Sequence, residues 1–359
     1  MSKFDLLTAR GVSRRSFLKL MAATTAALGL PSTVLPQSVK ALETALEKPP
    51  IIWLHGMECT GCSESLLATL NPSPAEVVLD MLSIRYHETI MAASGYVAEK
   101  AYQDTLKQNF VLVVEGSIPS KEDKYCMVAG KPFRETVLEA SKKAQAIIAV
   151  GSCAADGAGI PGACAVEAVG VRELLKIDNI TTPVINLPCC PVKPATMLGT
   201  IVYFLTYKEA PPLDSQARPK VFYGKLLHDN CPRRGQFEAG NFVKDWNDPA
   251  QKDYCLMLKG CKGPKTYTDC AQVWYNDNAN FCINAGSPCS GCSEAGFYAN
   301  FSPLYSKQEM FKLPGFGQID ADITGKVIGG AAVAGVAAHL AATAVSGRLG
   351  KKDHEHKED

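Results

Sequence analysis

Short runs of apolar residues alternate with amphipathic stretches between residues 49 and 207. The runs have the length of strands buried on both faces, and they cover residues 51–54, 110–114, 146–150 and 183–187. We expect another strand within the apolar segment 77–84. The stretches between the runs predict helices at residues 63–70, 133–145, 171–175 and 194–207. Because strands that alternate with helices build parallel sheets, we predict a flavodoxin-like, doubly wound α/β domain.

The periodicity disappears after a proline-rich stretch at residues 210–219. Residues 221–318 are rich in Gly, Asn, Asp, Tyr and Cys, and they contain few long apolar runs. A segment of this composition cannot bury a large core by itself. We therefore predict an irregular domain that bound metal stabilises, as metals do in other small domains.

Both ends of the chain carry segments that lie outside these two domains. Residues 13–19, Ser-Arg-Arg-Ser-Phe-Leu-Lys, precede a short apolar run, which is the pattern of a twin-arginine export signal. Residues 327–347 contain no Lys, Arg, Asp or Glu and can cross a hydrocarbon core of ~30 Å. A soluble alanine-rich helix is the alternative for this segment. Arg348, Lys351 and Lys352 follow it and place the tail in the cytoplasm.

We therefore predict five segments. They are an export signal (1–45), a flavodoxin-like domain (46–215), an irregular cysteine-rich domain (216–322), a transmembrane anchor (326–347) and a cytoplasmic tail (348–359). The globular part would lie on the periplasmic side of the membrane.

The net charge and the cysteine content narrow the range of possible functions. The net charge of +1 gives no basic surface for nucleic acid. Fourteen cysteines in 359 residues suggest either a disulfide framework or bound metal. Disulfide proteins of this density are usually small, whereas this chain has ample apolar sequence for a core. The Cys-x-x-Cys pairs therefore favour metal.

Four upstream cysteines follow predicted strands. Cys59 and Cys62 come after the first strand, Cys153 comes after residues 146–150, and Cys190 comes after residues 183–187. Parallel strands present their carboxyl ends at one edge, so we expect the four thiolates to converge there. Four is the number of ligands that a [4Fe–4S] cluster needs. A single cysteine would otherwise be a small buried apolar residue.

The second group of candidate ligands lies within sixty-five residues near the end of the chain. It consists of His228, Cys231, Cys255, Cys261, Cys270, Cys282, Cys289 and Cys292. The Cys231 thiol three residues after His228 favours a metal ligand over a surface histidine. These spacings predict more than one further metal site.

Several motifs together resemble the small, electron-transfer subunit of membrane-bound periplasmic [NiFe] hydrogenases. They are ECTGCSE at 58–64, YCMVAG at 125–130, GSC at 151–153, HDNC at 228–231, GCKGP at 260–264 and PCSGC at 288–292. The resemblance runs from the export signal to the C-terminal apolar segment. It implies a hydrogenase that oxidises or evolves H2, with the Ni–Fe site in a separate large subunit and no catalytic residue in this chain.

The resemblance also implies three iron–sulfur clusters and their ligands. The proximal [4Fe–4S] cluster would take Cys59, Cys62, Cys153 and Cys190, and the distal [4Fe–4S] cluster would take His228, Cys231, Cys255 and Cys261. A medial cluster would take Cys270, Cys289 and Cys292, which the family usually combines with a proline seven residues before the final pair. Cys282 occupies the position of that proline. We therefore expect a medial [4Fe–4S] cluster, or a [3Fe–4S] cluster if Cys282 does not bind.

The resemblance implies one of several kinds of electron acceptor. It is an integral membrane cytochrome b, a quinone-reducing membrane subunit, or a ferredoxin-like or cytochrome c carrier. The alternative function is that of an iron–sulfur subunit of another exported membrane oxidoreductase. Such subunits usually contain repeated CxxCxxCxxxC runs, and this sequence has none.

Four residues keep two interpretations each. Glu58 and Glu115 follow strands near the proximal ligands, where they either form a proton route or accept hydrogen bonds from backbone amides. Cys189 is either structural or a competing ligand beside Cys190. His339 in the apolar segment either contacts a haem-bearing partner or lies in a protein-facing pocket.

Overall fold

The computed structural model of the chain describes residues 49–70, 72–157, 166–297, 311–313, 317–319 and 321–346. The predicted export signal and cytoplasmic tail lie outside these residues. The chain divides into two units, Met1–Ser306 and Lys307–Asp359, and each is described by itself. The boundary predicted near residue 215, inside the first unit, remains a prediction.

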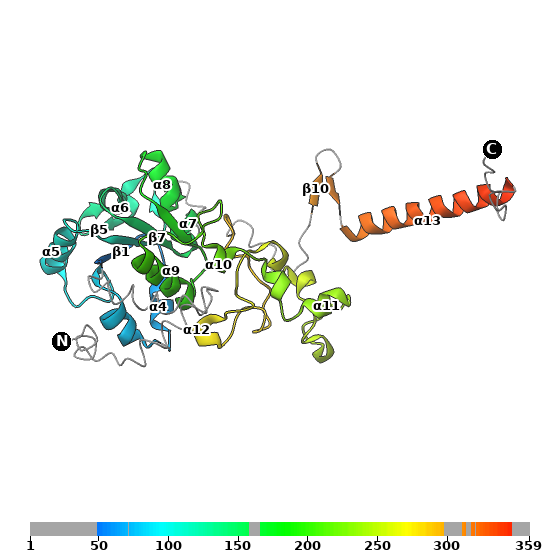
Figure 1. Cartoon of the computed structure of the whole chain (residues 1–359), viewed down its shortest axis with the longest axis horizontal. Helices are drawn as coiled ribbons and strands as arrows, with labels where there is room; N and C mark the ends of the chain where they lie inside the picture. Colours follow the sequence, from blue (N-terminus) through cyan, green and yellow to red (C-terminus); the bar gives the residue numbers. More distant parts are fainter. Residues whose placement is uncertain are drawn as a thin grey trace, which may run out of the picture. The chain divides into compact units, whose positions relative to one another are not determined.

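A five-stranded parallel sheet forms the centre of the first unit (Figure 1). All its neighbouring strands pair in parallel. The spatial order is β2 (Ile84–His87), β1 (Ile51–His55), β3 (Val111–Glu115), β7 (Ala146–Val150) and β9 (Val184–Leu187). This is the strand order of flavodoxin-like sheets. The predicted parallel α/β sheet is therefore confirmed.

Helices cover both faces of the sheet because both faces are apolar. Ile51 and Trp53 pack on one face with α4 (Gly61–Leu67) and α9 (Pro194–Tyr207). Ile52 and Leu54 pack on the other. There they meet α5 (Gly95–Thr105), α6 (Phe133–Ser141) and α8 (Val171–Ile177). Successive strand residues point to opposite faces, so an uninterrupted apolar run fills both layers.

Two elements of the structure differ from those predicted from the sequence. Residues 77–81 do not belong to a strand but to the π-helix η2 (Glu76–Met81), and β2 begins only at Ile84. The Leu82 amide donates to the Val77 carbonyl at 3.0 Å, a five-residue spacing that buries both side chains. Helix α5 was not predicted, because the exposed Tyr96 and Val97 blur its apolar face.

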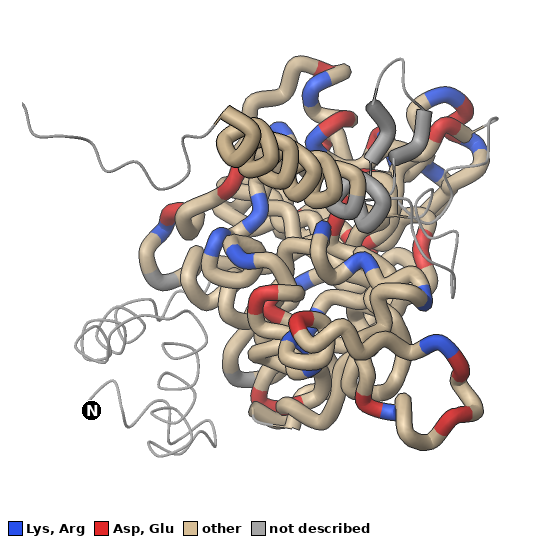
Figure 2. Tube along the Cα trace, turned by 90° about the vertical axis from the view of Figure 1, so that its right-hand side faces the viewer, with Lys and Arg blue, Asp and Glu red and all other residues tan. Residues whose placement is uncertain are grey.

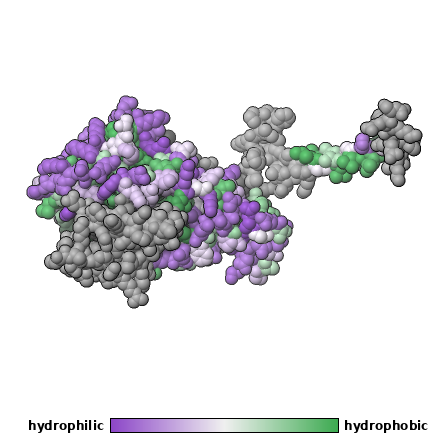
Figure 3. All heavy atoms as spheres, viewed as in Figure 1, coloured by the Kyte–Doolittle hydropathy of each residue, from purple (hydrophilic) through white to green (hydrophobic). Residues whose placement is uncertain are grey.

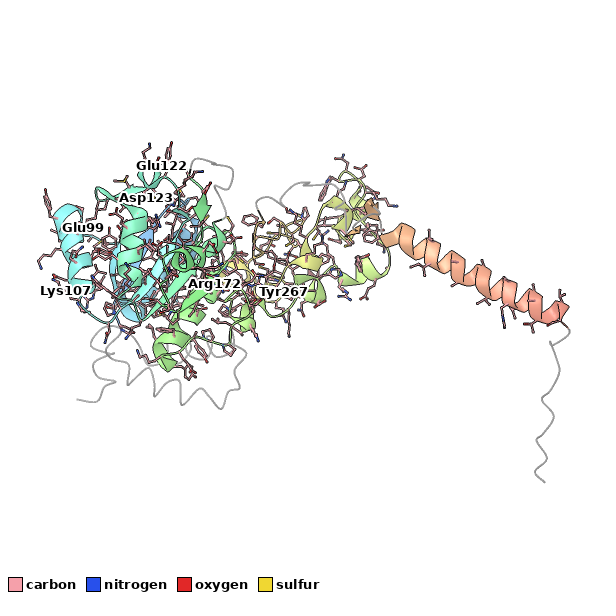
Figure 4. The ribbon with its side chains drawn as sticks, turned by 90° about the horizontal axis from the view of Figure 1, so that it is seen from above. Glu99, Lys107, Glu122, Asp123, Arg172 and Tyr267 are labelled. Atoms are coloured by element: carbon pink, nitrogen blue, oxygen red, sulfur yellow. The ribbon has the colours of Figure 1, made fainter. Side chains whose placement is uncertain are left out.

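The described residues after α9 form short elements around a small core of Leu227, Val243, Leu256, Phe281 and Ile283. The helices are α10 (Lys220–Tyr223), η4 (Leu227–Asn230), α11 (Arg234–Glu238), η5 (Pro249–Gln251), η6 (Met257–Lys259), η7 (Gly263–Lys265) and α12 (Tyr275–Asn278). This agrees with the irregular character expected of the segment. Tyr267 lies in this region (Figure 4), and its ring centroid is 5.8 Å from the Arg218 guanidinium carbon.

Polar contacts fasten this region to the carboxyl edge of the sheet. The buried Lys193 ammonium pairs with Asp269 and donates to the Val273 carbonyl at 2.9 Å. The Ser152 hydroxyl donates to the Cys292 carbonyl at 2.5 Å. Ser152 lies in α7 (Gly151–Asp156), directly after β7. The cysteine-rich region is therefore held where β7 and β9 end.

The remaining elements of the first unit are small. They are the 3-10 turn η3 (Asp123–Tyr125) and two antiparallel pairs, β4 (Ile118–Pro119) with β8 (Ala168–Val169) and β5 (Met127–Val128) with β6 (Lys131–Pro132).

The second unit contains a hairpin and one long helix. Strands β10 (Phe311–Leu313) and β11 (Gly317–Ile319) pair antiparallel, and α13 spans Ala321–Val345. Within the described chain, the 19-residue stretch Val327–Val345 is the one helix long and apolar enough to cross a membrane, judged by length and composition alone. Figure 2 shows this stretch without charged residues, and Figure 3 shows it as mainly hydrophobic.

We expect Ile148→Ala to destabilise the fold by about 2–5 kcal/mol, because Ile148 is fully buried in β7, which lies between β3 and β9 in the sheet. Ile177→Ala removes the same atoms from a side chain that is 50% exposed at the end of α8. Thermal unfolding midpoints of the two purified variants check this. Equal midpoints would contradict the assignment of β7 to the core.

Candidate metal centres

The structure brings Cys59, Cys62, Cys153 and Cys190 together at the carboxyl edge of the sheet. Cys59 precedes α4 and Cys62 lies within it, Cys153 lies in α7, and Cys190 follows β9. Burial raises the pKa of the Cys153 thiol to about 12, and the neighbouring Cys190 and Cys59 add to the shift. A thiol in this environment keeps its proton until a metal displaces it.

Two tight main-chain positions allow this convergence. Gly151 has φ of +89°, and a Cβ there would lie 2.8 Å from the Cys62 sulfur. A Cβ at Gly61 would lie 3.0 Å from the Cys59 sulfur. The chain therefore passes closer to these thiols than a larger residue allows.

Glu115, at the end of β3, holds the turn that carries Cys62. Its carboxylate accepts hydrogen bonds from the Cys62 amide at 3.0 Å and the Ser63 amide at 3.3 Å. It also accepts from the Ser63 hydroxyl at 2.6 Å and the Trp53 indole at 3.1 Å. Of the two interpretations of Glu115, the contacts favour the hydrogen-bond acceptor.

Glu58 has a different environment. One oxygen lies 3.2 Å from His55 Nδ1 and accepts from the Thr60 hydroxyl at 3.2 Å. The other is buried and has no hydrogen-bond partner among the described residues, as is also true of His55 Nε2. The His87 ring lies 4.6 Å from the His55 ring, and burial, reinforced by His55, lowers the pKa of His87 to about 3. Neither histidine was predicted as a site residue, although His55 ends β1 and His87 ends β2.

The four predicted distal ligands line one cavity. Its walls are formed by Leu227, His228, Cys231, Arg233, Cys255, Leu256, Met257, Cys261, Gly263, Pro264 and Ile283. Burial, followed by the charge of Arg234, lowers the pKa of His228. The Phe237 ring meets the imidazole edge-on at 4.6 Å between centroids. The lowered pKa favours the neutral imidazole, the form that binds metal.

The four predicted medial ligands also lie near one another. The Cys282 thiol is close enough to Cys292 and Cys270 for their charges to raise its pKa further, after burial. Thr268 Oγ1 lies 3.1 Å from the Cys270 sulfur. The Gly291 amide donates to the Cys289 sulfur at 3.4 Å. Cys282 is the exposed member of the set, whereas Cys270 and Cys289 are buried.

Direct contacts link the three sets in a row. The hydroxyl of Ser152, the residue before Cys153, donates to the Cys292 carbonyl at 2.5 Å, which joins the proximal set to the medial set. The Cys289 amide donates to the Cys261 sulfur at 3.4 Å, which joins the medial set to the distal set. All thirteen cysteines in the described residues carry free thiols. Three groups of four donors, eleven thiols and one imidazole, fit iron–sulfur clusters.

Two further cysteines among the described residues lie outside the three sets. Cys189 is buried, and its thiol lies close enough to Cys270 and Cys292 for them to raise its pKa, so the structure places it against the medial set rather than among the proximal ligands. Cys126 packs at the edge of the core formed by α5, α6 and α8, and burial raises its pKa to about 11. His339 lies on α13, and no described contact of its ring chooses between its two interpretations.

Comparison with known proteins identifies the family. Residues 223–305 match the C-terminal family of the NiFe/NiFeSe hydrogenase small subunit, and residues 59–204 match the family of the 20 kDa subunit of NADH ubiquinone oxidoreductase. The uptake hydrogenase small subunit of Azotobacter vinelandii is 42% identical over 360 residues, covering 98% of each chain. The chain belongs to the [NiFe] hydrogenase small subunit family.

Other relatives agree with this hydrogenase assignment. The periplasmic [NiFe] hydrogenase small subunit of Solidesulfovibrio fructosivorans is 43% identical over 307 residues, covering 84% of this chain and 95% of the relative. The Ni-Fe-Se hydrogenase structure from Desulfomicrobium baculatum superposes with a TM-score of 0.67 at 34% identity, covering 73% of this chain and all of that one. Residues 11–31 match the twin-arginine translocation signal family.

As a hydrogenase small subunit, the chain is part of an oxidoreductase and transfers electrons as the partner of a large subunit. Members of this family bind iron–sulfur clusters. The expected recognition and function are confirmed, and the alternative of another exported oxidoreductase is set aside. The twin-arginine match supports export to the periplasm.

Gly151→Ala is expected to disturb the proximal set, because the added Cβ would meet the Cys62 sulfur. The matched control is Gly130→Ala, since Gly130 also has positive φ (+78°) but no atom within 4 Å of the place that a Cβ would take. We expect iron and sulfide to fall by up to about four per chain in Gly151→Ala only. An equal loss in both variants would show that backbone strain, rather than the contact with Cys62, is responsible.

Proposed function

We propose that this subunit holds three iron–sulfur clusters in a row and connects the Ni–Fe site of the large subunit with an electron acceptor at the membrane. The observation that carries the proposal is the pair of hydrogen bonds from Ser152, next to Cys153, to Cys292 and from Cys289 to Cys261, which place four-ligand sets next to one another. When bound, such clusters supply one-electron relay chemistry.

The proximal [4Fe–4S] cluster is assigned to Cys59, Cys62, Cys153 and Cys190. Support comes from their convergence at one sheet edge and from the four hydrogen bonds with which Glu115 fixes the turn around Cys62. Glu58 is the better candidate for a proton route, because one of its buried oxygens lacks a partner among the described residues.

The distal [4Fe–4S] cluster is assigned to His228, Cys231, Cys255 and Cys261, which share one cavity. A neutral imidazole carries one negative charge less than a thiolate. Replacement of a thiolate by imidazole raises the potential of other clusters, so His228 favours acceptance of electrons at the outer end of the row.

The medial cluster is assigned to Cys270, Cys282, Cys289 and Cys292, and we propose that it is a [4Fe–4S] cluster. The proximity of Cys282 to Cys270 and Cys292 supports this ligand set. A fourth thiolate adds negative charge, which lowers the potential relative to a [3Fe–4S] centre. The three potentials would then lie closer together.

We also propose that α13 anchors the subunit, with its globular part in the periplasm and its tail in the cytoplasm. The length and composition of Val327–Val345 support this placement. The acceptor is then an integral membrane cytochrome b or a quinone-reducing subunit. A ferredoxin-like or cytochrome c carrier replaces it if the helix does not enter a membrane.

Cys282→Pro tests the medial assignment, since it restores the residue that the family usually has there. We expect the oxidised wild-type complex to lack a stoichiometric [3Fe–4S] EPR signal and the variant to gain one, while iron falls from about twelve to about eleven per chain. Cys126→Ser is the control and should leave the spectrum unchanged. A strong [3Fe–4S] signal in the wild type would refute the proposed four-thiolate centre.

Truncation before residue 321 tests the anchor. The shortened subunit, expressed with its large subunit, should move from the membrane fraction to the soluble periplasmic fraction and retain H2-dependent dye reduction. Removal of residues 348–359 alone is the control and should leave the complex in the membrane fraction. If the longer truncation also remained there, another part of the complex would be the anchor.

A further inference from the structure

Two phenols from the region after α9 hold the turn that carries Cys190. The Tyr223 hydroxyl donates to the Pro188 carbonyl at 2.7 Å, and the Tyr275 hydroxyl donates to the Pro191 carbonyl at 2.9 Å. Both lengths are typical of O–H···O hydrogen bonds. Cys190 is a proposed ligand of the proximal cluster, so the two tyrosines hold the main chain on either side of a ligand.

This turn depends on such contacts because it belongs to no helix or strand. Strand β9 ends at Leu187 and α9 begins at Pro194, so no regular structure supplies hydrogen bonds to the carbonyls between them. The Ser152 amide donates to the Cys189 carbonyl at 3.1 Å. The two phenols supply bonds to carbonyls on both sides of it.

Tyr223 is also connected with one side of the medial set. Its side chain is buried, and its ring centroid lies 5.6 Å from the guanidinium carbon of the buried Arg218. Arg218 donates to the Ser293 carbonyl at 3.0 Å, and Ser293 directly follows Cys292. The Tyr223 ring therefore packs against a side chain that holds the main chain next to a medial ligand.

Tyr275 is connected with the other side of the medial set. It lies between Cys270 and Cys282 in the sequence. Its amide donates to the Asn280 carbonyl at 2.9 Å, which closes the turn before Cys282. This one residue therefore joins the loop that leads to Cys282 with the turn that carries the proximal ligand.

We propose that Tyr223 and Tyr275 are positioning residues that set the separation between the proximal and medial centres. The proposal rests on the proposed function, because it requires Cys190 to bind one cluster and Cys282 and Cys292 to bind the other. Each tyrosine acts through the main chain next to a ligand and is not itself a ligand. Electron transfer slows steeply as the distance between two centres grows, so the two hydroxyls would keep the first step of the relay fast.

Phenylalanine variants of the complete heterodimer test the proposal, since they remove a hydroxyl and keep the ring. They are Tyr223→Phe, Tyr275→Phe and the double variant. The matched control is Tyr102→Phe, because Tyr102 is a buried residue of α5 whose hydroxyl also donates to a main-chain carbonyl, that of Thr136 at 3.4 Å.

Three measurements compare these variants with the wild type. Iron and sulfide content shows whether all clusters are present. The splitting of the EPR signals of the fully reduced complex reports the magnetic interaction between neighbouring clusters, and the medial–distal part of it is common to all variants. Amide hydrogen exchange of residues 189–193 reports how firmly the turn is held.

We expect about twelve iron atoms per chain in every variant. The proximal–medial splitting should be weaker in Tyr223→Phe and Tyr275→Phe and should disappear in the double variant. Exchange in the turn should be about two- to tenfold faster in each single variant, which is the effect of one lost hydrogen bond. The Tyr102→Phe complex should match the wild type in all three measurements.

Unchanged splitting in the double variant would overturn the proposal and leave both tyrosines as packing residues. An equal change in Tyr102→Phe would also overturn it, because loss of a hydroxyl anywhere in the sheet domain would then have the same effect. If the double variant cannot be isolated, the single variants decide, since each keeps one of the two hydrogen bonds.

Failure of the proposed function looks different. Wild-type protein with iron and sulfide well below about twelve per chain would contradict the three-cluster assignment. A fully reduced wild-type complex without any splitting would contradict the arrangement of the clusters in a row. Both results appear before any variant is compared.

Discussion

The parallel alignment of β1, β7 and β9 is the constraint on which the rest of the molecule depends. A cluster needs four thiolates within a few ångströms, and each pair or single cysteine here comes from a different part of the sequence. Parallel strands have their carboxyl ends at the same edge of the sheet, so the turns that follow them lie close together. The sheet brings the cysteines close together. Gly151 and the carboxylate of Glu115 then fix the position of Cys62 more closely.

The region after α9 depends on that edge in turn. The region has a small apolar core, which buries few side chains for the number of residues that it stabilises. This core consists of Leu227, Val243, Leu256, Phe281 and Ile283. Metal–thiolate bonds can supply the missing cohesion, because their free energy becomes folding free energy when the ligands lie far apart in the sequence. The buried Lys193–Asp269 pair joins this region to the segment after β9.

Much of this could be predicted from the sequence, for reasons that vary with the feature. The strands of the sheet core appeared as uninterrupted apolar runs because both faces are covered, and the edge on which Cys59, Cys153 and Cys190 meet followed from strand direction alone. Helix α5 was not predicted because Tyr96 and Val97 on its surface are exposed apolar residues. The π-helix η2 was not predicted because its hydrogen bonds join residues five apart rather than four. The side on which Cys189 lies depends on how the chain leaves β9, which adjacency to Cys190 does not reveal. The pairing of His55 with Glu58 likewise required the folded turn.

The hydrogen bond from the Cys289 amide to the Cys261 sulfur has a consequence for biogenesis. A main-chain atom of the medial set is thus a hydrogen-bond donor to a ligand of the distal set, so filling one centre helps to fix a ligand of the other. Insertion of the iron–sulfur clusters into the subunit should therefore be cooperative, so few chains should carry only some of their clusters. For a protein that leaves the cytoplasm through the twin-arginine route, such coupling would act as a checkpoint: an incompletely loaded chain stays loosely folded and is recognisable before it is committed to export.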